Sequence, residues 1–106
     1  MIQFRISFEV ENTKASEFEK MVHDTYGPAL ERQPGFVAWR LLTPYESDDA
    51  AAGEEATQLD LEFEFDSEQD RLVWAASSDH APAWATAVAL SRNYRAQGSN
   101  VLGASE

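Results

Sequence analysis

Two segments of the chain, residues 2–10 and 58–66, alternate strictly between apolar and polar side chains. A period of two places the apolar side chains of a β-strand on one face and the polar side chains on the other. We therefore predict two strands, each with one buried face that a second layer of structure must cover. The apolar residues are Ile2, Phe4, Ile6, Phe8 and Val10 in the first segment, and Leu59, Leu61, Phe63 and Phe65 in the second.

A helical pattern follows the first strand. Residues 11–33 keep apolar side chains at helical spacing, and Ser16 with Glu19 resembles a capping box near the start. Gly27 and Pro28 interrupt the pattern. Because proline has no backbone N–H, we expect a kink or a break in the helix at that point.

A second apolar run follows the Pro-Gly pair at residues 34–35. The apolar residues of the segment 36–43 do not alternate, which favours a strand that is buried on both faces. Trp39 and Arg40 are neighbours on this strand, so their side chains point to opposite faces. A weaker strand pattern spans residues 94–102 and is interrupted by a glycine.

Helical signals also follow the second alternating strand. Ser67 precedes a helical segment with acidic residues in its first turn, as expected for a capping serine. Ser77 or Ser78 then caps a further helical segment, which carries Pro82 in its first turn and runs to about residue 91. The sequence therefore predicts a helical region that restarts near residue 78.

The predicted order of elements is β-α-β-β-α-β, in a single domain of residues 1–106. This order is typical of an α+β, ferredoxin-like fold with a four-stranded antiparallel sheet in the order 4-1-3-2 and both helical regions on one face. The other face of the sheet is then open, and we predict it to be half apolar. A two-fold homodimer whose sheets face each other would cover that face.

The charge and composition exclude several classes of function. The net charge is −11, from 19 acidic and 8 basic residues, which disfavours nucleic acid and anionic lipid as partners. The chain has no cysteine, which excludes disulfides and thiolate catalysis. Neither a signal-peptide pattern nor a membrane-spanning run occurs, so we expect a cytoplasmic protein. Residues 43–57 form a long polar loop, for which the sequence leaves open a role as a lid.

Four short motifs resemble those of the antibiotic biosynthesis monooxygenase family, which belongs to the dimeric α+β barrel superfamily. They are Phe-Glu-Lys at 18–20, Gln-Pro-Gly-Phe-Val-Ala-Trp-Arg-Leu-Leu at 33–42, Phe-Asp-Ser-Glu-Gln at 65–69 and Ser-Ser-Asp-His-Ala-Pro-Ala-Trp at 77–84. The resemblance implies two sheets packed as a dimeric barrel, with a pocket between the helices and the sheet of each subunit. It also implies oxidation of polyphenolic or quinol-like substrates by dioxygen without a cofactor, whereas a related branch degrades haem.

Three aromatic residues lie close together in the sequence, at Trp74, His80 and Trp84. If residues 79–90 are helical, His80 and Trp84 share one face, and the dipole at the helix start favours a neutral imidazole. A neutral His80 could accept a proton from a phenol. The alternative is that His80 is a capping or surface residue and that the tryptophans belong to the core.

The other candidates for the pocket wall are Tyr26 and Trp39. Tyr26 lies on the apolar stripe of its helix and could present its hydroxyl to the pocket, or could bond a backbone carbonyl within the core. We expect His23 at the surface. The predicted substrate-binding residues are thus Trp74, Trp84, Tyr26 and Trp39, with His80 as the catalytic residue.

We predict no metal and no cofactor. Asp60, Glu62 and Glu64 line one strand face, with neighbours roughly 6–7 Å apart along the strand, and no histidine accompanies them. We expect these acids to pair with Arg40 or Arg5 on adjacent strands.

Two differences from the enzymatic pattern keep other functions open. Phe65-Asp66-Ser67 stands where active members often have Trp-Glu-Ser, and residues 2–10 lack the Asn of the haem-degrading branch. The leading hypothesis is a cofactor-independent monooxygenase that acts on a small aromatic or quinol-like compound. The alternative is a non-catalytic, dimeric small-molecule-binding or accessory protein, and haem degradation is a third possibility that the missing Asn disfavours.

Overall fold

A computed structural model of the chain describes residues 1–45 and 55–105. The strands form one antiparallel sheet in the order β2-β3-β1-β4, which is the predicted order read from the other edge. Their bounds are Ile2–Glu11 for β1, Phe36–Leu42 for β2, Ala56–Phe65 for β3 and Asn93–Asn100 for β4. Most of the predicted loop 43–57 lies outside the described residues.

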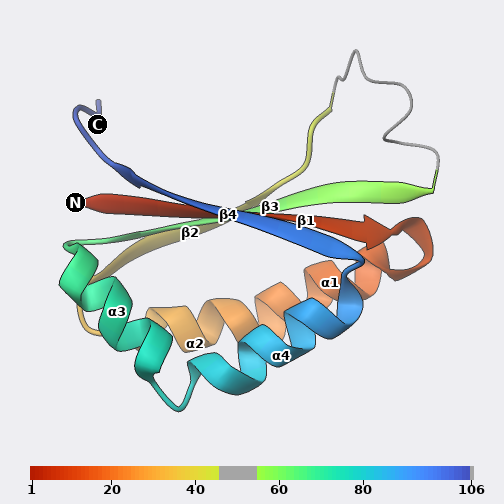
Figure 1. The fold of residues 1–106 in the computed structure, drawn as a ribbon, viewed down its shortest axis with the longest axis horizontal. Coiled ribbons are helices and arrows are strands. Elements are labelled where there is room, and N and C mark those ends of the chain that lie inside the picture. The colour runs from red at the N-terminus through yellow and green to blue at the C-terminus, as the bar shows by residue number, and fades with distance from the viewer. Residues whose placement is uncertain (46–54, 106) are drawn as a thin grey trace.

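All the helices lie on one face of the sheet (Figure 1). The first helical region contains the 3₁₀ turn η1, the helix α1, the π-helical segment η2 and the helix α2. The second contains α3 and α4, as predicted for a region that restarts. The bounds are Asn12–Lys14 for η1, Ala15–Met21 for α1, Val22–Tyr26 for η2, Gly27–Glu31 for α2, Glu68–Ala76 for α3 and His80–Leu90 for α4.

Pro28 accounts for the wide turn in the first helical region. Its missing N–H leaves the carbonyl of Asp24 without the usual helical donor four residues later. The chain widens instead, and the N–H of Gly27 donates to the carbonyl of Val22, five residues earlier. The predicted break at Pro28 is therefore confirmed as a π-helical turn. The capping box at Ser16 was wrong, because η1 leads the chain into α1 and Ser16 already lies within the helix.

Serines lie at the start of α3 and at the break between α3 and α4. Ser67 Oγ accepts a hydrogen bond from the Asp70 N–H at 3.1 Å, which confirms Ser67 as the cap of α3. At the restart, Ser77 Oγ donates to the Trp74 carbonyl at 2.8 Å and accepts from the His80 N–H at 3.3 Å. Ser77 therefore links the end of α3 to the first residue of α4. The prediction that Ser77 or Ser78 caps this helix is wrong, because the N-cap position of α4 is Asp79, whose side chain makes no capping hydrogen bond.

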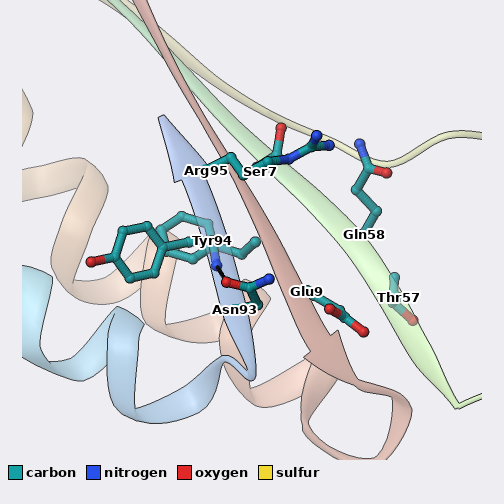
Figure 2. Close-up of a pocket in the computed structure, with 8 residues that line it drawn as sticks. Ser7, Glu9, Thr57, Gln58, Asn93, Tyr94 and Arg95 are labelled. Carbon is teal, nitrogen blue, oxygen red and sulfur yellow. Dashed lines mark hydrogen bonds between the residues drawn. The ribbon is translucent and has the colours of Figure 1, made fainter. Parts of the chain in front are cut away.

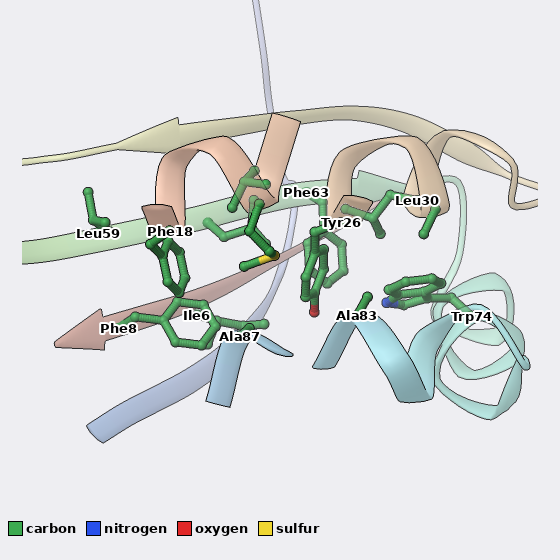
Figure 3. Packing of buried hydrophobic residues seen from close by; sticks show 14 of the residues in the cluster. Ile6, Phe8, Phe18, Tyr26, Leu30, Leu59, Phe63, Trp74, Ala83 and Ala87 are labelled. Carbon is green, nitrogen blue, oxygen red and sulfur yellow. The ribbon is translucent and has the colours of Figure 1, made fainter. Parts of the chain in front are cut away.

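The core fills the space between the helices and the apolar face of β1 and β3 (Figure 3). Both alternating segments place their predicted apolar residues on that face, as the register between β1 and β3 requires. The largest fully buried side chains include Trp74, Tyr26, Phe8 and Phe18. The two helical regions and the sheet thus meet in an interior rich in aromatic rings.

The open face of the sheet is polar at its centre, which corrects the prediction of a half-apolar face. Glu62 is only 3% exposed and accepts hydrogen bonds from Arg5 Nε at 2.8 Å and from Arg40 at 3.2 Å, which confirms the predicted ion pairs. The prediction that β2 is buried on both faces is also wrong for the single chain. Val37 and Leu42 are 42% and 39% exposed, because helices cover only one side of the sheet.

Candidate functional site

Trp74, His80 and Trp84 meet where α3 passes into α4. The imidazole of His80 lies edge-on to the indole of Trp74, with ring centroids 5.0 Å apart. It also lies nearly parallel to the indole of Trp84, at 6.1 Å and an interplanar angle of 13°. The structure therefore brings together the three residues that the sequence singled out, one turn of helix separating His80 from Trp84.

His80 is half-buried between these two rings. Burial lowers the pKa of His80 from its ordinary value of 6.5, since an apolar surrounding disfavours the charged imidazolium. The neighbouring acid, Asp79, is engaged elsewhere: it accepts a hydrogen bond from Gln33 at 3.0 Å and pairs with Arg32 at 3.4 Å. The imidazole is thus neutral at physiological pH and is available as a proton acceptor.

Tyr26 lies behind Trp74, deeper in the interior. Its ring contacts the Trp74 indole edge-on, with centroids 5.9 Å apart, and the residue is 1% exposed. Among the described residues, no group hydrogen-bonds the Tyr26 hydroxyl, so the alternative of a bond to a backbone carbonyl is not observed there. Burial raises the pKa of this hydroxyl, which therefore stays protonated and remains a donor.

Trp39 occupies a different part of the fold. Its ring contacts His23 at 5.5 Å, and its Nε1 donates to Glu31 at 3.4 Å. It also lies over Gly27, where an added Cβ would be 2.6 Å from the indole. Ring contacts link Tyr26, Trp74, His80 and Trp84 in a chain, and Trp39 belongs to a second cluster on β2, the edge strand opposite β4. His23 is exposed, as predicted.

The sequence matches no protein-family model and no curated protein. Solved structures, in contrast, are similar over nearly the whole chain. A mutant of SnoaB, a cofactor-independent oxygenase from Streptomyces nogalater, has a TM-score of 0.78 at 21% identity, with 97% of this chain and 94% of that chain covered. A candidate antibiotic biosynthesis monooxygenase from Deinococcus radiodurans has a TM-score of 0.79 at 8% identity, with coverages of 100% and 97%. The chain has the antibiotic biosynthesis monooxygenase fold.

A third similar structure is that of a mutant of MhuD with two manganese protoporphyrin IX molecules bound per active site. Its TM-score is 0.72 at 21% identity, with 100% of this chain and 99% of that chain covered. The similar structures thus include a cofactor-independent oxygenase and a porphyrin-bound protein. At these identities the likeness establishes the fold, and the chemistry of this chain has to be argued from its own residues.

Within this fold, the sequence did not predict the position of Tyr94. Its ring lies edge-on to Trp84 at 4.9 Å and extends the aromatic cluster to β4. Tyr94 is the one aromatic residue of β4, whose alternation is weak, so the sequence did not indicate which face its side chain occupies. The register does place it, because Tyr94 lies opposite Phe8, whose side chain faces the helices.

A shallow hollow of about 370 Å³ was also not predicted. It is lined by polar side chains of β1, β3 and β4, among them Ser7, Glu9, Gln58 and Arg95 (Figure 2). These side chains come from three strands, and only the sheet register brings them together.

Phe8 and Tyr94 also line the hollow, so it borders the aromatic cluster at Tyr94. Its polar side chains, however, do not face that cluster. Ser7 alternates with the buried Ile6 and Phe8, so its side chain lies on the open face of the sheet, away from His80. In residues 1–45 and 55–105, no three His, Cys, Asp or Glu side chains are grouped as a metal site. No helix in the same part of the chain is long and apolar enough to cross a membrane.

Proposed function

We propose that this chain is a cofactor-independent monooxygenase that oxidises a small aromatic or quinol-like compound with dioxygen. The observation that carries the proposal is the position of His80, whose neutral imidazole is held between the indole rings of Trp74 and Trp84. The likeness to SnoaB, a cofactor-independent oxygenase, supports the reaction class. His80 would accept the proton of a phenol or an enol, and the surrounding rings would bind the aromatic body of the substrate.

The reaction balances without an added reductant. A benzylic CH₂ group that is conjugated through the ring with a carbonyl, as in anthrone, loses a proton to His80 and gives an electron-rich phenolate. The phenolate transfers its electrons to dioxygen, one oxygen atom becomes the new carbonyl oxygen, and the other leaves as water. For anthrone, one molecule of substrate and one of dioxygen yield one anthraquinone and one water, and the substrate supplies all four electrons.

His80→Ala should therefore lower the rate of oxygen uptake with anthrone by about a hundredfold, a usual contribution of a general base. Uptake is measured with an oxygen electrode on chelator-treated protein, and anthraquinone formation is followed by absorbance. The matched control is His23→Ala, because His23 is exposed and lies against Trp39 rather than in this cluster. Equal rates for wild type and His80→Ala, or no uptake by the wild type above buffer, would refute the assignment.

The pH dependence follows from the lowered pKa of His80. The base must be neutral, so the rate is full above the pKa and falls as the imidazole becomes protonated. Since burial moves that pKa downward, the acid limb of kcat/KM should lie below pH 6.5. The same neutral form contributes stability that is present above pH 6.5 and is lost as the pH falls through the folded-state pKa.

One observation favours the accessory form of the non-catalytic alternative, in which no ligand enters the interior. Trp74 and Tyr26 are 2% and 1% exposed, so a ligand that reaches them must first displace a packed indole. A small-molecule-binding protein of the same fold would show affinity for aromatic compounds but no oxygen uptake. Haem degradation is disfavoured. Gln3 and Ser7 are polar residues of β1 that could substitute for the missing Asn, but they pair with Glu64 and Asp60 and lie on the open face of the sheet.

We also propose that two copies associate through their open sheet faces. Leu42 is 39% exposed on that face beside Asp60, and the buried Glu62 is flanked by Arg5 and Arg40. Leu42→Asp should shift the protein from dimer to monomer in size-exclusion chromatography with light scattering. Leu72→Asp is the control, since Leu72 is 47% exposed but belongs to α3 in the helical layer. A monomeric wild type would contradict this arrangement.

A further inference from the structure

The hydroxyl of Tyr26 is a buried donor without a partner among the residues that the structure describes. Leaving such a group unpaired is unfavourable, because the hydroxyl gives up its hydrogen bonds to water and gains none, so native proteins seldom keep one without a role. A phenylalanine would fill the same space without that cost. The presence of a tyrosine at this position therefore needs an explanation.

The direction of the hydroxyl is set by the first helical region. Tyr26 is the last residue of the π-helical segment, which Pro28 imposes, and π-helical turns often occur at functional sites. Figure 3 shows the hydroxyl directed toward α4, beside Ala83 and Trp74. Ala83 is 1% exposed, and its methyl group offers no hydrogen-bond acceptor.

Tyr26 and the half-buried His80 both contact the indole of Trp74. Trp74 contacts the His80 imidazole at 5.0 Å and the Tyr26 ring at 5.9 Å, so one indole separates the candidate base from the candidate donor. An aromatic ring that takes the place of this indole would lie between the two groups. Its oxygen could then accept a hydrogen bond from Tyr26, while His80 lies on the side nearer the surface.

We propose that Tyr26 is the positioning residue of this site, and that its hydroxyl donates to the oxygen of a phenolic or ketonic aromatic ligand that displaces the Trp74 side chain. This inference rests on the proposed function for the identity of the base. It extends that function by naming the ligand class, an aromatic ring with one oxygen substituent. In the free protein the Tyr26 hydroxyl has no hydrogen-bond acceptor among the described residues, and the bound ligand supplies one.

Tyr26→Phe separates this role from a structural one. If the hydroxyl is unpaired in the free protein, its removal raises the melting temperature, by about 4–8 °C for a gain near 1 kcal/mol. Tyr45→Phe is the matched control, because Tyr45 is 95% exposed, and it should leave the melting temperature unchanged. A lower melting temperature for Tyr26→Phe would mean that the hydroxyl already has a partner, which would overturn the proposal.

Binding is measured by calorimetric titration with 1-naphthol and with naphthalene, which lacks the oxygen. Tyr26→Phe should weaken 1-naphthol binding roughly fivefold to tenfold, the usual effect of one neutral hydrogen bond, and should leave naphthalene binding unchanged. Equal 1-naphthol affinity in wild type and Tyr26→Phe, or no binding by the wild type, would refute the inference.

The ligand role of Tyr26 and the monooxygenase activity can be tested independently of each other. Binding that depends on Tyr26, together with no oxygen uptake, would retain the ligand site and reject the monooxygenase. Oxygen uptake that depends on His80 but not on Tyr26 would retain the enzyme and reject Tyr26 as the positioning residue.

Discussion

Trp74→Ala should lower the free energy of unfolding by about 3–5 kcal/mol, the usual cost of truncating a buried tryptophan. The indole is 2% exposed and contacts both Tyr26 and His80, so its removal loses buried area and leaves a cavity at the centre of the candidate site. The loss is measured by urea denaturation. Val73→Ala is the control, because Val73 is the preceding residue of α3 and is 43% exposed.

The cavity left by Trp74→Ala gives a second readout. Added indole should fill it and raise the melting temperature of Trp74→Ala, with a smaller effect on the wild type, because a ligand that binds only the folded state stabilises that state. A loss of stability below about 1 kcal/mol would contradict the packing described for Trp74. If the free energy of unfolding falls by the expected amount of about 3–5 kcal/mol but indole does not raise the melting temperature, the neighbouring side chains have collapsed into the cavity.

Gly35→Ala should lower the free energy of unfolding by about 2–4 kcal/mol, from the combined cost of backbone strain and overpacking. Gly35 has a φ of +78°, a conformation that side chains with a Cβ disfavour. An added Cβ would also lie 2.2 Å from Asp70 Oδ2 and 2.9 Å from Asp70 Cβ. Asp70 cannot move freely, because its N–H and carboxylate are both hydrogen-bonded to Ser67.

Two comparisons test the account of Gly35. Gly103→Ala should be neutral within about 0.5 kcal/mol, since no atom lies within 4 Å of the Cβ that it would add. In the double mutant Gly35→Ala with Asp70→Ala, the loss should be smaller than the sum of the two single losses, because the second change removes the carboxylate atoms that lie nearest the added Cβ and leaves only the contact with the Cβ of residue 70. Additive losses would show that the steric contact contributes nothing.

Much of the fold could be predicted because the sequence encodes it locally. The alternation at residues 2–10 and 58–66 predicted the bounds of both central strands to within two residues at each end. It also determined which face of each strand is buried, since a shift of the pairing by one residue would bury the polar side chains. Ser67 was recognisable as a cap for the same reason: its bond to the Asp70 N–H is made within one turn. Ser16 satisfied the same rule but failed, because the preceding 3₁₀ turn had already started the helix.

The candidate site was predictable only where its residues are near in sequence. Trp74, His80 and Trp84 come together because α3 and α4 are consecutive, whereas Trp39 could be placed only by the sheet. It lies on β2, three strand positions from β4, or roughly 14 Å at the usual strand spacing. The unpaired hydroxyl of Tyr26 could not be predicted from the sequence either. An apolar stripe on a helix predicts that a side chain is buried, but it does not show which hydrogen-bond acceptors lie near it.

The most direct test of the site is a crystal structure of the wild-type protein with 1-naphthol. The ring is predicted to lie between His80 and Tyr26, with the Trp74 indole displaced and the naphthol oxygen within hydrogen-bond distance of the Tyr26 hydroxyl. Naphthol bound instead in the polar hollow beside Ser7 and Gln58, with Trp74 still packed against Tyr26, would contradict the account.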